Sequence, residues 1–208
     1  MASFVVRLYF YAGSEQIKIV HSFVYDGDQN KDFIRALGIR MDAPMREALY
    51  NRHVAFSCAN GGVWSEPVQP LAGRRKLTLG KEDTLSLQQQ QMDGKRIPPY
   101  EAFDGKNRDL LDNWASWNDY RLSQLSADAF SIRKRANDNN PWIGTFSGTR
   151  SGGYAFVGDI TGGLGLCCMI LAVISFIPRN IGCQNFICND HSMVMEPRRR
   201  TDGLTSLR

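Results

Sequence analysis

The sequence has few of the features that are typical of zinc-binding or nucleic-acid-binding proteins. It has five cysteines among 208 residues, and their spacings never form the paired CxxC…CxxC pattern of zinc sites. The formal net charge of +4 is too small by itself to indicate a nucleic-acid partner. The first residues, MASFVVRLYF, place Arg7 inside a short apolar run and do not form a secretory signal. Zinc and nucleic acid are therefore not expected, and the cellular location is left open.

Alternating apolar residues predict a mainly β protein. The chain length suggests one domain with an appendage, and an apolar fraction of 43% is enough for a core. Phe4–Tyr11 and Ile17–Tyr25 are expected to form a hairpin, and Phe33–Met41 a third antiparallel strand paired with the second, because short polar turns separate them. Further strands are predicted at Val54–Cys58, Leu122–Leu125 and Ala129–Lys134.

One acidic segment has the spacing of calcium ligands. Asp26, Asp28, Asn30 and Asp32 occur at every second position, as at the start of a calcium-binding loop. The helix-loop-helix form of that loop also needs Gly at its sixth and Glu at its twelfth position, where this chain has Lys31 and Leu37. A polar turn is the simpler interpretation, and no metal or other cofactor is assigned.

Two regions have the composition of a binding surface. Arg52 and His53 enter a predicted strand, where they lie either at a substrate-binding rim of the sheet or simply in solvent. The stretch from Ala59 to Asn113 is irregular, and long irregular segments often line binding sites. Trp114 and Trp117 follow it, and they are equally suited to stack on sugar rings or to anchor the core.

A second basic group surrounds a predicted turn at Asn137–Asn140. Arg133, Lys134 and Arg135 precede this turn, Trp142 opens a glycine-rich run after it, and Arg150 lies further along. Guanidinium groups bind carboxylates in a forked geometry, so arginines in such a group are candidate contacts for an acidic ligand.

Several separated blocks resemble one protein family. They are LSQLSADAFSIRKR, WIG, TRSGGYAFVGD and GGL, preceded by RLYFYAGSEQIKIVHSFVYDGDQNKDFIRALGIRMD and NRHVAFSCANGG. Together they cover Phe4 to Gly165 and resemble the central region of the exo-rhamnogalacturonan lyase-like family, which includes the YetA-like bacterial proteins. The resemblance implies an incomplete, supersandwich-like antiparallel β-sandwich from the middle of a longer, secreted enzyme.

The resemblance also implies a substrate and a reaction. Its partner would be an acidic plant cell-wall polysaccharide, cleaved by β-elimination at galacturonate, which needs a base and a group that neutralises the carboxylate. Nothing orients His53 or Tyr154 as a base, so no catalytic residue is assigned, and the chain is expected to be inactive without its flanking domains. A carbohydrate-contacting module without catalysis is the alternative. The expected substrate-binding residues are Arg52, His53, Arg133, Arg135, Trp142 and Arg150.

The tail has two competing interpretations. Ile160–Pro178 carries no charge, which predicts a membrane helix over residues 160–177 with Arg198–Arg200 on the cytoplasmic side. Codons compatible with Leu171–Phe176, read one nucleotide later, can instead encode WQSYP, and the same shift further on can give TAWLWSPDAEPMDLRHY, which continues the family resemblance. We therefore favour a partial sandwich domain over residues 1–166 and an out-of-frame tail, coiled or helical, over residues 167–208.

Overall fold

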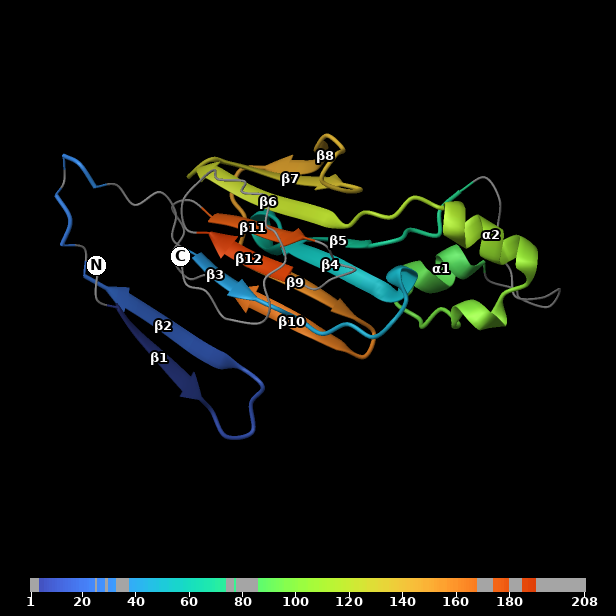
Figure 1. The fold of residues 1–208 in the computed structure, drawn as a ribbon, viewed down its shortest axis with the longest axis horizontal. Helices are drawn as coiled ribbons and strands as arrows, with labels where there is room; N and C mark the ends of the chain where they lie inside the picture. The colour runs from blue at the N-terminus through green and yellow to red at the C-terminus, as the bar shows by residue number, and fades with distance from the viewer. Residues whose placement is uncertain are drawn as a thin grey trace. The chain divides into compact units, whose positions relative to one another are not determined.

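The computed structural model describes residues 4–24, 26–28, 30–32, 38–73, 77, 86–167, 174–179 and 185–189. The chain divides into two compact units, residues 1–35 and residues 36–208. The first unit holds a two-stranded sheet and the second holds one sheet of four strands and one of six (Figure 1).

The first unit is the expected β-hairpin. β1 (Phe4–Phe10) pairs antiparallel with β2 (Ile17–Phe23), from Phe4 opposite Phe23 to Phe10 opposite Ile17. Gly13 lies in the turn with φ +74°, a left-handed conformation that glycine adopts without strain. Every side chain of β1 is exposed, so this hairpin gains little from burial within its own unit, and an isolated hairpin is marginally stable in water.

The third strand, predicted over Phe33–Met41, is confirmed for Gly38–Met41, while residues 33–37 lie outside the described residues; its predicted pairing is wrong. β3 (Gly38–Met41) pairs antiparallel with β12 (Asn185–Asn189) at the edge of the six-stranded sheet, and not with β2. Alternation along the sequence shows that a segment is extended, but it carries no information about which strand lies beside it. The three-stranded meander over Phe4–Met41 is therefore not formed.

The two sheets of the second unit are built from antiparallel neighbours. The four-stranded sheet has the order β10-β9-β4-β5 and the six-stranded sheet has the order β3-β12-β11-β6-β7-β8. Their remaining strands are β4 (Arg52–Ser57), β5 (Val63–Pro67), β6 (Asp119–Ser126), β7 (Ala129–Arg135), β8 (Ile143–Gly148), β9 (Tyr154–Asp159), β10 (Gly162–Cys167) and β11 (Ile174–Arg179).

One apolar core joins the two sheets. Val54 and Phe56 of β4 are fully buried, as are Leu122 of β6 and Ile132 of β7, and all four belong to a single cluster. Since β4 belongs to the four-stranded sheet and β6 and β7 to the six-stranded one, the inner faces of the sheets pack against each other. This arrangement confirms the expected antiparallel β-sandwich.

Short helical segments between β5 and β6 form a second, smaller core. α1 (Leu87–Met92) begins at Ser86 and α2 (Gly105–Asn113) begins at Asp104, and both N-cap side chains accept a hydrogen bond from a backbone N–H of the first turn. The 3-10 turn η3 (Tyr100–Ala102) lies between these two helices. Two other 3-10 turns, η1 (Leu49–Asn51) and η2 (Ala59–Gly61), flank β4. The stretch that looked irregular in the sequence is therefore partly helical.

A buried glutamine holds this helical segment to the sandwich. Gln91 of α1 is 5% exposed, donates to the carbonyl oxygens of Tyr50 (2.6 Å) and Gln69 (3.0 Å), and accepts from the backbone N–H of Leu71 (2.8 Å). Three hydrogen bonds offset the cost of burying its amide. The short glutamine run thus contributes a structural contact between segments far apart in the sequence.

The tail enters the sheet, which corrects both expectations for it. β11 pairs with β6, placing Phe176 opposite Leu122, and its other edge pairs with β12. A membrane helix over residues 160–177 is wrong, because β10 and β11 occupy the two ends of that range. A coiled or helical tail is also wrong for the residues of β11 and β12. A strand inside a sheet reads as a continuous apolar run, which periodicity alone cannot distinguish from a buried helix. Within the described ranges, no helix is long and apolar enough to cross a membrane.

Candidate functional site

The outer face of the six-stranded sheet carries two arginines side by side. Leu122 and Ile132 point into the core, so their neighbours Arg121 of β6 and Arg133 of β7 point outward. Arg121 and Arg133 are direct cross-strand partners. Arg133 is exposed and Arg121 is half-buried, so Arg133 offers guanidinium donors to an anionic group at this face.

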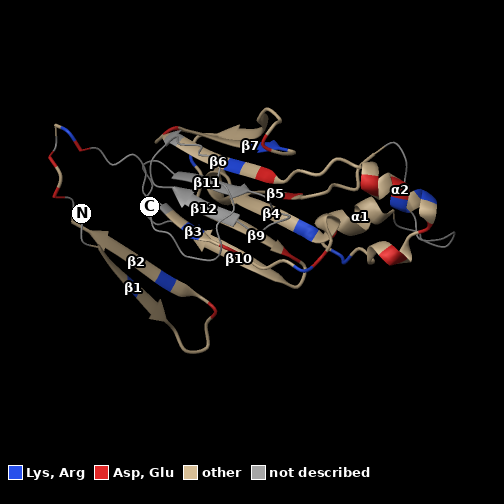
Figure 2. Cartoon of the chain, viewed as in Figure 1, with Lys and Arg blue, Asp and Glu red and all other residues tan. Residues whose placement is uncertain are grey.

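The side chain of Arg133 is accessible to a ligand from solvent. It is exposed, and it forms no ion pair with any residue that the structure describes. Its partner on β8 is Gly144, where an added Cβ would meet no atom within 4 Å. Arg121 is held in place by a 2.7 Å hydrogen bond from its Nε to the hydroxyl of Ser123. Figure 2 shows the basic residues on β6 and at the end of β7. We call Arg121 and Arg133 the arginine pair.

Arg135 and Trp142 lie together, but Arg135 is engaged inside the protein. Its side chain is 8% exposed, and its Nε lies 2.7 Å from Asp119 Oδ2, while a terminal nitrogen pairs with Asp138. Its guanidinium carbon lies 4.7 Å from the centre of the Trp142 ring. The indole nitrogen of Trp142 is buried with no hydrogen-bond partner. This group joins the end of β7 to the turn that follows it and leaves Arg135 few free donors.

Lys134 connects the two sheets. Its ammonium pairs with Glu66 of β5 and lies 4.3 Å from the centre of the Trp117 ring. Trp117 packs against the main core, so of its two proposed roles the structure shows that of a core anchor.

Arg52, His53 and Arg150 lie apart from the arginine pair. Arg52 and His53 are half-buried at the start of β4, in the other sheet, and Arg52 Nε donates to the carbonyl of Glu47 at 2.7 Å. Burial lowers the pKa of His53, which keeps its imidazole neutral at pH 7. Arg150 is exposed between β8 and β9. The six sequence-predicted residues are therefore spread over both sheets and do not form one site.

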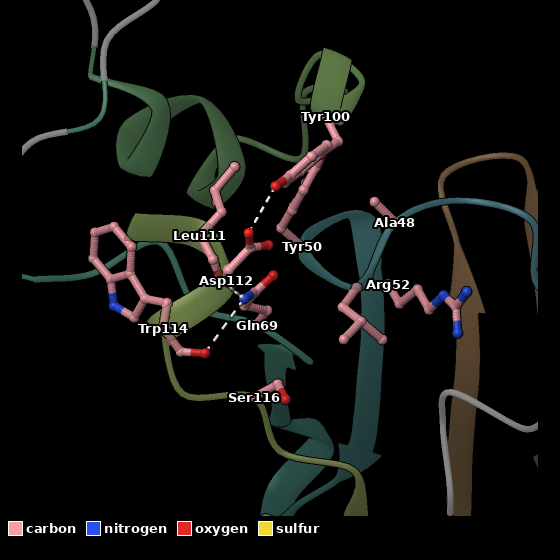
Figure 3. A pocket seen from close by; sticks show the side chains of 10 residues that line it. Ala48, Tyr50, Arg52, Gln69, Tyr100, Leu111, Asp112, Trp114 and Ser116 are labelled. Atoms are coloured by element: carbon pink, nitrogen blue, oxygen red, sulfur yellow. Dashed lines mark hydrogen bonds between the residues drawn. The ribbon is translucent and has the colours of Figure 1, made fainter. Parts of the chain in front are cut away.

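A pocket of about 420 Å³ lies where the helical segment meets the start of β4 (Figure 3). The sequence analysis did not predict it, although it singled out two of its residues. It is lined by Ala48, Leu49, Tyr50, Arg52, Gln69, Tyr100, Leu111, Asp112, Trp114 and Ser116. Of the residues that line the pocket, only Trp114 and Arg52 were named as candidates from the sequence. The others come from segments without a motif.

Trp114 forms a fixed wall of this pocket. Its indole nitrogen donates to the carbonyl of Ala72 at 3.2 Å, and its ring packs so closely on Gly73 that an added Cβ there would come within 2.4 Å of it. One face of the ring is thereby covered. The structure thus places Trp114 as an anchor of the helical segment, with its backbone carbonyl turned toward Gln69 (Figure 3).

Tyr100, His53 and Tyr154 are side chains of the described residues that could in principle act as bases. Tyr100 donates its hydroxyl to Asp112 Oδ2 at 2.7 Å, and this hydrogen bond raises the pKa of the phenol, which keeps it protonated at pH 7. No carboxylate of the described residues is hydrogen-bonded to His53 to orient it, and Tyr154 is exposed on β9. No group of three or more His, Cys, Asp or Glu side chains in the described ranges is placed to hold a metal ion. In the acidic segment, Asp28 and Asp32 instead accept backbone hydrogen bonds within their own turn.

These features define a class: an antiparallel β-sandwich domain with an arginine pair on one outer face and a small polar pocket. The model for the PcRGLX-like protein central beta sandwich domain matches residues 1–172, and the chain belongs to this rhamnogalacturonan lyase-like family. It is 33% identical over 163 residues to a protein of Bacillus subtilis (strain 168) named uncharacterized protein YetA. The match covers 78% of this chain and 18% of that relative, so the chain spans less than a fifth of the longer protein.

Proposed function

We propose that this domain contacts an acidic polysaccharide of the rhamnogalacturonan type and leaves the β-elimination at galacturonate to other parts of a longer lyase-like protein. The observation that carries this proposal is Arg133, which is exposed on the outer face of the sandwich directly opposite the half-buried Arg121. Galacturonate carboxylates are spaced along such a polymer, and guanidiniums bind carboxylates with two parallel hydrogen bonds. The membership in a rhamnogalacturonan lyase-like family supports the same ligand.

The geometry supports binding better than catalysis. β-Elimination requires a base near the proton at C5 and a donor that stabilises the carboxylate. The arginine pair supplies donors, while the residues described around it on β6, β7 and β8 include no histidine or tyrosine on the outer face. The isolated chain is therefore expected to bind the polymer without releasing unsaturated, ultraviolet-absorbing sugar.

Affinity electrophoresis and calorimetric titration test the binding proposal with an acidic rhamnogalacturonan and a neutral galactan. Arg133→Ala should weaken binding of the acidic polymer about fivefold, since an exposed charge-assisted contact contributes about 1 kcal/mol. Lys106→Ala is the charge-matched control, because Lys106 is an exposed residue of α2. Binding should also weaken with salt, which screens exposed charges within about 8 Å at physiological ionic strength. Equal binding of both polymers, or equal losses in the two variants, would refute the proposal.

The change of reading frame in the tail stays a hypothesis. The family match ends at residue 172, close to the expected change of frame, whereas β11 and β12 lie beyond it. Sequencing the gene together with its transcript decides the matter. A transcript that confirms the present frame, with no continuation of the family in the shifted frame downstream, would exclude the hypothesis.

A further inference from the structure

We propose that the pocket beside α2 binds a neutral pyranose unit of a carbohydrate, and that it does so separately from the arginine pair. The size of the pocket is suitable, since 420 Å³ lies within the roughly 300–1,000 Å³ of small-molecule sites. The choice of a carbohydrate as ligand rests on the proposed function, while the preference for a neutral unit follows from the groups in the pocket wall.

Gln69 presents a fixed hydrogen-bond acceptor. The residue is 7% exposed, and its Nε2 donates to the carbonyls of Leu111 (2.9 Å) and Trp114 (3.4 Å). Carbonyls only accept, so these two contacts determine which end of the amide carries the nitrogen. The side-chain oxygen receives no hydrogen bond from any described residue, and Figure 3 shows it on the side away from the Trp114 carbonyl. This oxygen is therefore available to accept a hydrogen bond from a ligand or from water.

Asp112 and Ser116 add two more polar groups. Asp112 uses Oδ2 to accept the hydrogen bond from Tyr100, and its other carboxylate oxygen has no protein donor among the described residues. The hydroxyl of Ser116 likewise makes no hydrogen bond within the described ranges and lines the same pocket. The wall therefore offers a carboxylate oxygen, an amide oxygen and a hydroxyl, and these groups together are complementary to the hydroxyl donors of a sugar.

The presence of Arg52 in the pocket wall does not make the pocket favour an acidic sugar over a neutral one. Arg52 lines the pocket, but its Nε donates to the carbonyl of Glu47 and its guanidinium points away from Asp112 and Gln69 (Figure 3). A ligand carboxylate would meet the charge of Asp112 instead. Tyr50, Tyr100 and Leu111 supply apolar surface for the C–H face of a pyranose ring. The pocket is thus suited to a neutral sugar unit and poorly suited to galacturonate.

Saturation-transfer and titration NMR on the full chain test this inference. The ligands are methyl galactopyranoside and methyl rhamnopyranoside as neutral probes, galacturonate as an acidic probe and ethylammonium as a cationic probe. We expect neutral sugars to bind with millimolar dissociation constants, at least tenfold more tightly than galacturonate. Asp112→Ala should weaken neutral-sugar binding at least tenfold. Asp112→Asn should reduce the difference in dissociation constant between neutral sugars and galacturonate.

Asp109→Asn is the matched control, because Asp109 is an exposed residue of the same helix that does not line the pocket. It should leave sugar binding unchanged within twofold, as should Arg133→Ala. If Arg133→Ala leaves binding of the acidic polymer intact while Asp112→Ala still abolishes sugar binding, the proposed function fails and the pocket assignment stands. Absence of sugar binding, equal losses in the Asp109 and Asp112 variants, or binding of ethylammonium alone would overturn the pocket assignment.

Discussion

Asp159 at the end of β9 provides the sharpest test of how the sandwich is held together. Its Oδ2 accepts from the backbone N–H groups of Arg46 (2.8 Å) and Glu47 (3.2 Å), and its Oδ1 accepts from the N–H (2.8 Å) and the hydroxyl (2.5 Å) of Thr161. Burial alone would raise its pKa, but these hydrogen bonds outweigh burial and lower the pKa from 3.8 to about 2. The carboxylate therefore fastens the segment before η1 to the β9–β10 turn.

The size of the effect follows from the lowered pKa. A decrease from 3.8 to about 2 corresponds to about 2 kcal/mol of folding stability at pH 7. Because the folded-state pKa is below the unfolded-state value, this contribution is complete above pH 3.8 and is lost as the pH falls toward 2. Asp159→Asn keeps the size of the side chain but replaces one accepting oxygen with a donor, so it should cost about 2 kcal/mol at pH 7.

Urea unfolding followed by tryptophan fluorescence measures this loss. The gap in unfolding free energy between wild type and Asp159→Asn should be about 2 kcal/mol from pH 7 to pH 5 and should narrow between about pH 4 and pH 2. Asp109→Asn, an exposed aspartate of α2, should change stability by less than about 0.5 kcal/mol. A gap below about 0.5 kcal/mol, or one that stays constant down to pH 2, would refute the reasoning.

Two further predictions concern packing and charge in the six-stranded sheet. Gly148→Ala should destabilise the protein by about 1–3 kcal/mol, because a Cβ there would lie 2.7 Å from the buried ring of Phe130. Gly144→Ala on the same strand meets open space and should leave stability unchanged. Equal losses of stability for the two variants in urea unfolding would contradict this. Arg135→Ala should cost about 3 kcal/mol by leaving the buried carboxylate of Asp119 without its cation, and the double change Arg135→Met with Asp119→Leu should cost less. A double variant as unstable as the single one would show that the charges themselves are needed.

Local pattern was sufficient to predict six of the twelve strands that the structure describes. β6 and β7 lie where two apolar alternations were expected, and the turn at Asn137–Asn140 is closed by a hydrogen bond between its two ends. In a strand, successive side chains point to opposite faces, so a half-buried strand leaves an alternating record in the sequence. The family resemblance, carried by blocks spread over this region, correctly implied the sandwich.

The candidate site could be predicted only in part. Arg133 was identified as a basic contact and lies on the exposed outer face, but Arg135, two positions later, is buried against Asp119. The two arginines lie on the same face of β7, because they are two positions apart and the pairing with β6 is regular from Asp119–Arg135 to Leu122–Ile132. They differ because Arg135 is covered by its contacts with Asp119, Asp138 and Trp142, and contacts between these segments leave no pattern in the sequence.

The sequence by itself thus determined the local conformation of the segments with clear alternation, such as the β1–β2 hairpin, β4, β6 and β7, and it indicated which residues are apolar enough for a core. The tertiary structure alone decided that β3 pairs with β12, that Glu66 meets Lys134 across the two sheets, and that Gln69, Tyr100 and Asp112 surround one pocket. The physical reason is the range of the interactions. Backbone conformation depends on a few neighbouring residues, whereas strand partners and pocket walls depend on contacts between segments tens of residues apart, which leave no periodic trace in the chain.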